Sequence, residues 1–155
     1  MQKTRLRFLV AALAITTGPA VSLVATAETT SQDAADYRES VMTSLKGHIG
    51  AASMHVRGLV DGPEFLLKHA RGLANGASEI ATLFPAGSNV EGSEALPVIW
   101  EQPEEFAAAV EKLVDATKKF VAAAERDDKP AIAAAFRDVG GSCKGCHDKF
   151  RAPKD

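Results

Sequence analysis

The chain has 155 residues, of which 46% are hydrophobic and 25% are charged, and its formal net charge at pH 7 is −2. This length is that of one domain. All 20 acidic residues but only 15 of the 18 basic ones follow residue 27, so the chain beyond that point has a net charge of −5, which argues against nucleic-acid binding.

The first 27 residues have the pattern of a secretory signal peptide. A positive segment at residues 3–7 precedes an apolar run at 8–15, and small residues at 25–27 form a cleavage site before Glu28. The alternative is an uncleaved membrane anchor, but Thr-Thr-Gly-Pro at 16–19 interrupts the apolar run and leaves it short for a span. We predict an exported chain without a stable membrane anchor, whose mature part is one domain, residues 28–155.

The first half of the mature chain predicts two helices. Apolar residues recur with a helical period over about residues 33–58, and Asp61-Gly62-Pro63 then forms a turn that starts a second helix over about 64–83. The predicted core-facing stripes are Val41, Leu45, Ala52, Val56 and Leu59 in the first helix and Leu66, Ala70, Leu73, Ala77, Ile80 and Phe84 in the second.

The second half predicts two more helices after a long connection. Residues 85–103 contain three Pro and two Gly and show no period. The third helix ends at Asp127-Asp128, and the fourth begins at Lys129-Pro130. Their stripes are Phe106, Val110, Leu113, Thr117, Phe120 and Ala124, then Ile132, Phe136, Val139, Cys143, Cys146 and Phe150. Four amphipathic helices with short, long and short connections predict an all-α fold, an antiparallel four-helix bundle.

Cys143, Cys146 and His147 form a C-x-x-C-H sequence, the attachment signature of a c-type haem. Each thiol can add to a haem vinyl group to form a thioether, and the histidine can reach the iron. On a helix the three side chains project within about a 100° sector, so one macrocycle can meet them all. We predict one haem c, covalently bound through two thioethers, in the periplasm where such haem is attached, and therefore no disulfide.

A redox dithiol and a structural zinc site are the alternatives for this motif. The dithiol motif normally opens a helix after a strand, whereas this one lies late in a helical pattern. Zinc needs four ligands, and the chain has no second C-x-x-C and no H-x-x-x-H. His48 and His55 are separated by about 10.5 Å of helix rise and cannot share one ion on a straight helix. Together with His69, they are predicted to be surface or boundary residues.

These features resemble the class II c-type cytochromes, the family that includes cytochrome c-prime and its low-spin relatives. The resemblance covers residues 33–152. Its most specific element is the C-terminal position of the motif, within residues 143–151, because class I cytochromes c carry it near the N-terminus. Weaker elements are residues 37–42, 83–85 and 97–100.

The resemblance implies the arrangement of the site. Haem should pack near one end of the bundle, with His147 as proximal iron ligand and the first helix over the distal face. Arg38 should meet a haem propionate, and Arg151 should lie near the proximal face. Family members differ at the position of Met42: in low-spin members a methionine there binds the iron, whereas many cytochromes c-prime have a bulky apolar residue and five-coordinate iron. Some five-coordinate members also have methionine.

We predict that Met42 is the second iron ligand, the alternative being that it only fills the core. The predicted function is that of a periplasmic mono-haem electron carrier, which exchanges single electrons with redox partner proteins and is not an enzyme. The alternative is a five-coordinate protein that binds nitric oxide or carbon monoxide. A peroxidase is disfavoured because no distal His and Arg pair lies near Met42. The family also implies a homodimer, and Lys144 and Lys149 are candidates for a docking surface.

Overall fold

The computed structural model of the chain describes residues 28–153. The predicted signal peptide, residues 1–27, lies outside the described residues. Within the described part, no helix is both long enough and apolar enough to cross a membrane.

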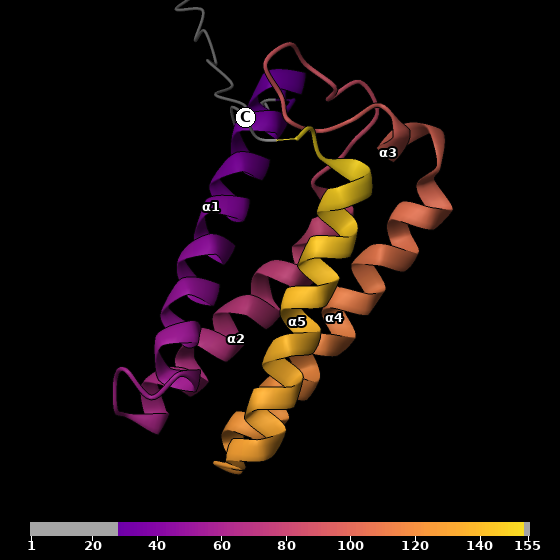
Figure 1. Cartoon of the computed structure of the whole chain (residues 1–155). Helices are drawn as coiled ribbons and strands as arrows, with labels where there is room; N and C mark the ends of the chain where they lie inside the picture. The colour runs from indigo at the N-terminus through magenta and orange to yellow at the C-terminus, as the bar shows by residue number, and fades with distance from the viewer. Residues whose placement is uncertain (1–27, 154–155) are drawn as a thin grey trace, which may run out of the picture.

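The four predicted helices are confirmed (Figure 1). They are α1 (Ser31–Val56), α2 (Pro63–Glu79), α4 (Pro103–Glu125) and α5 (Lys129–Phe150). A 3-10 turn, η1 (Ile80–Thr82), continues α2. Neighbouring helices run antiparallel, and α1 packs on α2, α2 on α4, and α4 on α5. The contact between α1 and α5 is sparse.

Local sequence signals set the ends of α1. Thr30 caps its start, since the Thr30 hydroxyl accepts from the backbone N–H of Asp33 while the Asp33 carboxylate accepts from that of Thr30. Gly58 ends it with a φ of 69°. The predicted core position of Leu59 was therefore wrong: it lies beyond the helix and is 58% exposed.

The sequence predicts an irregular connection over residues 85–103, but the structure contains one short helix there. Val98–Glu101 forms the one-turn helix α3, and Ile99 within it is buried. Four residues are too few to show a helical period in the sequence.

The core lies mainly between α2, α4 and α5. Phe120 of α4 and Val139 of α5 are fully buried. By contrast, Val41 and Leu45 on the α1 stripe are only half-buried, because α1 has little contact with α5. The structure thus leaves the apolar face of α1 less covered than those of the other three long helices.

Candidate haem site

The C-x-x-C-H motif occupies the last two turns of α5. Cys143, Cys146 and His147 are all half-buried, and both cysteines pack against the core. As predicted, the motif lies within a helix rather than at its start, so the three side chains share one side of α5.

The two cysteines do not have the character of a redox dithiol. Burial raises the pKa of each thiol above its ordinary value, with Cys143 adding to the effect at Cys146. Redox-active C-x-x-C motifs have a lowered thiol pKa instead. Among residues 28–153, no group of three or more His, Cys, Asp or Glu side chains is placed to hold a metal ion, which leaves no four-ligand zinc site there.

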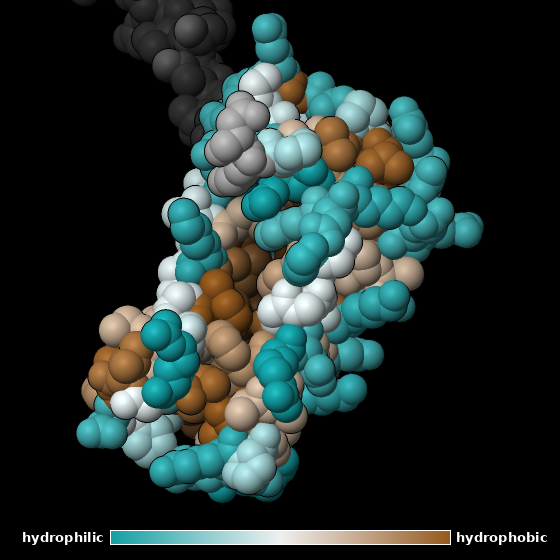
Figure 2. All heavy atoms as spheres, viewed as in Figure 1, coloured by the Kyte–Doolittle hydropathy of each residue, from teal (hydrophilic) through white to brown (hydrophobic). Residues whose placement is uncertain are grey.

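A furrow with an apolar floor runs between α1 and α5 (Figure 2). It exists because these two helices make few contacts with each other. Apolar side chains of both helices therefore stay half-buried while packing against the core: Val41, Met42, Leu45 and Ile49 from α1, and Phe136, Cys143 and Cys146 from α5. Apolar surface next to two thiols and a histidine fits a flat, largely apolar macrocycle with two vinyl groups. The residues present thus fit a haem c.

Arg38 is a buried cation near the start of α1, with only 5% of its surface exposed. Its Nη1 donates to the Leu83 carbonyl and the Ser88 hydroxyl, each at 3.2 Å. Its Nη2 donates to the Ser88 carbonyl at 3.1 Å and to the Ser93 hydroxyl at 3.0 Å. The guanidinium lies 4.7 Å from the centre of the Phe84 ring, and burial lowers its pKa. These bonds tie α1 to the long connection, and contact with a haem propionate stays a prediction.

Replacing Arg38 by methionine should lower the free energy of unfolding by about 3 kcal/mol. The variant keeps the aliphatic stem but leaves buried carbonyl and hydroxyl oxygens without their charged donor. Chemical denaturation followed by circular dichroism measures the loss. The matched control is Arg57→Met at the exposed end of α1, which should change stability by less than about 0.5 kcal/mol. Equal losses in the two variants would contradict a stabilising role for the hydrogen bonds of Arg38.

The same connection also pairs with the end of α5. Residues 94–96 lie against residues 150–152 through a β-bridge between Ala95 and Arg151, with backbone hydrogen bonds of 3.0 and 2.8 Å on either side. Because Arg38 holds the preceding part of the connection, the start of α1 and the end of α5 meet at one end of the bundle.

Met42 lies one turn after Arg38, and His147 one turn before Arg151. Both side chains are half-buried, and that of Met42 packs against the core. The fold therefore brings both predicted iron ligands towards the same end of the bundle. The ligand role of Met42 stays a prediction, as do the haem-binding roles of Cys143, Cys146 and His147.

Aromatic residues close this end of the bundle through contacts between different elements, and the sequence did not predict those contacts. The ring centres of Phe84 and Phe106 are 4.8 Å apart, and those of Phe106 and Phe150 are 5.2 Å apart. The indole N–H of Trp100 donates to the carbonyls of Phe84 at 3.2 Å and Pro85 at 3.0 Å. The helical stripes predicted burial of Phe84, Phe106 and Phe150 but not these cross-helix contacts.

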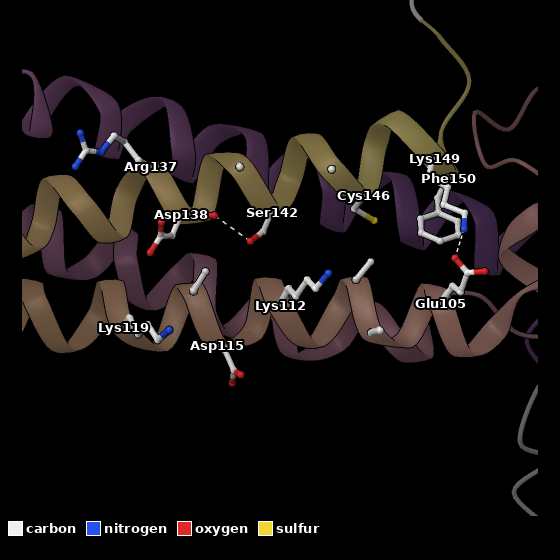
Figure 3. Close-up of a pocket in the computed structure, with 15 residues that line it drawn as sticks. Glu105, Lys112, Asp115, Lys119, Arg137, Asp138, Ser142, Cys146, Lys149 and Phe150 are labelled. Carbon is white, nitrogen blue, oxygen red and sulfur yellow. Dashed lines mark hydrogen bonds and ion pairs between the residues drawn. The ribbon is translucent and has the colours of Figure 1, made fainter.

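A second groove lies between α4 and α5 (Figure 3). Cys146 borders it, and seven of its fifteen lining residues are charged, with basic and acidic side chains both present: Glu105, Lys112, Asp115, Lys119, Arg137, Asp138 and Lys149. The two lysines predicted to form a docking surface are paired with acids, Lys144 with Asp148 and Lys149 with Glu105. This surface is therefore mixed in sign rather than uniformly basic.

Comparisons with known proteins agree with the geometry. The family model for cytochrome c' matches residues 33–151. The cytochrome c' of Rhodospirillum rubrum is 33% identical over 138 residues, which cover 84% of this chain and 94% of the relative. The nitric oxide complex of a leucine-to-alanine variant of cytochrome c prime from Alcaligenes xylosoxidans has a TM-score of 0.76 at 31% identity, covering 83% of this chain and all of that one. A carbon monoxide-bound leucine-to-glycine variant gives 0.75 at 31%, covering 80% and 98%.

A four-helix bundle with C-x-x-C-H on its last helix and an apolar furrow beside it defines a helical c-type cytochrome. The chain belongs to the cytochrome c' family. The predicted family and the predicted four-helix bundle are thus both confirmed.

Proposed function

We propose that this protein binds a diatomic gas, nitric oxide or carbon monoxide, at a haem whose iron has His147 as its single protein ligand. The observation that carries the proposal is the likeness to cytochrome c prime of Alcaligenes xylosoxidans, solved with nitric oxide and with carbon monoxide bound. We therefore favour gas binding, which the sequence analysis gave as the alternative, over the predicted electron transfer.

The residues of α5 hold the cofactor in this proposal. When bound, haem c supplies an iron that can take a gas molecule on the face that no protein group occupies. Cys143 and Cys146 fix the macrocycle to α5 through thioethers, and the imidazole of His147 provides the proximal nitrogen. Since all three lie on the last turns of one helix, their relative positions are set before the cofactor binds.

The first half of α1 forms the distal side in this proposal. Val41, Met42 and Leu45 supply half-buried apolar surface and no charge. Such a wall excludes polar ligands and limits the room for a gas molecule. Met42 then acts by packing and not by ligation.

Carbon monoxide titration of the reduced protein tests the function. We expect saturable binding of one equivalent without a preceding slow step, because no protein sulfur has to leave the iron. Binding that is absent, or whose rate is independent of carbon monoxide concentration, would contradict an open site.

Electron transfer with Met42 as iron ligand is the second candidate. The observation that favours it is that Met42 lies in the half of α1 whose start meets the end of α5 that carries His147. Methionine and histidine together are the axial pair of many electron-transfer haems. In that case the partners are redox proteins. Neither candidate transforms a substrate, so we do not propose an enzyme.

Variants of Arg151 test whether its charge acts on the haem from the side of His147. Its Nε is buried without a hydrogen-bond partner, and the nearest carboxylate oxygen, that of Glu94, is 4.0 Å away. A positive charge near the haem stabilises the ferrous form, so Arg151→Met should lower the midpoint potential by the equivalent of about 1 kcal/mol. Arg151→Lys keeps the charge and should change it far less. Redox titration measures both, and equal shifts would contradict an electrostatic role.

Export to the periplasm is part of the proposal. The mature protein should begin at or near Glu28, because the small residues before it form the cleavage site. Mass analysis of the periplasmic fraction checks this. Finding residues 1–27 retained in a membrane fraction would contradict export as a soluble protein.

A second copy of the chain is the protein partner that we propose. Large apolar side chains are exposed around the turn between α1 and α2, namely Met54, Leu59, Val60 and Phe65. Light scattering of the purified holoprotein should give the mass of a dimer. A monomer mass at micromolar concentration would contradict the proposal.

A further inference from the structure

Three histidines gather where α1 packs on α2. His48 and His55 lie two turns apart on α1, and His69 of α2 faces both. The ring centre of His69 is 5.4 Å from that of His48 and 6.2 Å from that of His55. All three side chains are half-buried. This cluster is separate from the haem motif.

A glycine on α2 makes room for the His48 ring. A Cβ atom at position 72 would lie 2.4 Å from Nε2 of His48 and 2.5 Å from its Cε1. The Nε2 edge of the ring therefore rests on the backbone of α2. That contact leaves Nδ1 of His48 facing His69, with the two Nδ1 atoms 3.1 Å apart.

This separation suits two nitrogen ligands of one metal ion. Zinc–imidazole bonds are about 2.0–2.1 Å long, so nitrogens 3.1 Å apart subtend about 100° at a shared ion. The angle lies between the cis angle of a tetragonal copper(II) site and the angle of a tetrahedral zinc site. Without an ion, one proton between the nitrogens makes the hydrogen bond.

We propose that His48 and His69 form a two-histidine site for a divalent transition-metal ion, copper(II) or zinc(II). Solvent completes the coordination, since no third His, Cys, Asp or Glu among residues 28–153 is placed to join them. The ion would join α1 to α2.

Calorimetric titration of the ferric holoprotein with copper(II), and separately with zinc(II), tests the site. We expect one equivalent of copper(II) to bind more tightly than zinc(II). His48→Ala and His69→Ala should each weaken binding by about tenfold or more, because either change removes one of two ligands. The matched control is His55→Ala, which should keep the wild-type affinity within about threefold.

A fourth variant separates ligand loss from ligand displacement. Gly72→Ala keeps both histidines but pushes the His48 ring from its position, so it should weaken copper binding as His48→Ala does. Circular dichroism and the haem absorption spectrum should stay unchanged in all four variants. Wild-type affinity in either the His48 or the His69 variant, or an equal loss in the His55 variant, would overturn the two-histidine site.

Discussion

Replacing both Cys143 and Cys146 by alanine should leave the mature polypeptide with no covalently bound haem. The two half-buried thiols are the only cysteines of the chain, so no other residue can form a thioether. Acid-acetone extraction followed by intact mass measurement checks this. The wild-type chain should keep the mass of one haem after extraction, and the double variant should show the polypeptide mass alone.

Ser142→Ala is the matched control for this pair. Ser142 precedes the motif, and its hydroxyl only donates to the Asp138 carbonyl of its own helix, at 2.9 Å. This variant should retain haem like the wild type. Release of the haem from correctly matured wild-type protein by acid-acetone would contradict covalent attachment.

Met42 variants should separate packing from ligation by the size of the spectral change. If Met42 only packs, Met42→Leu nearly conserves volume and should cost under about 1.5 kcal/mol in stability, with the haem spectrum unchanged. Met42→Ala removes part of the distal wall and should speed carbon monoxide association by about tenfold, equivalent to about 1.4 kcal/mol of barrier. Absorption spectra and flash photolysis measure these effects.

The control for these variants is Met54→Ala. Met54 lies on the same helix but is 46% exposed, so its truncation should alter neither spectrum nor carbon monoxide kinetics. Conversion of a low-spin wild type into a high-spin Met42→Leu protein would instead establish Met42 as an iron ligand.

The sequence predicted the long helices well because their apolar stripes persist over 17 to 26 residues. It failed where a single residue or one turn decides the structure. The positive φ of Gly58 ends α1 before Leu59, and α3 is too short to show a period. The half-buried face of α1 was not foreseen either, since a stripe does not reveal how closely another helix approaches it.

The haem motif could be predicted because its residues are neighbours in the chain. The partners of Arg38 could not, because they lie 45 to 55 residues away, at the end of the second predicted helix and in the connection that follows it. The same holds for His48 and His69, which are 21 residues apart on different helices. Only the packing of α1 on α2, with Gly72 under the His48 ring, brings them together.

The measurement that tests the central claim most directly is the spin state of the ligand-free wild-type protein. Absorption and electron paramagnetic resonance spectra of the ferric form, and the absorption spectrum after reduction with dithionite, report it. An iron with His147 as its only protein ligand should be high-spin in both oxidation states. Low-spin spectra in both states would contradict the gas-binding proposal and favour Met42 as the second ligand of an electron carrier.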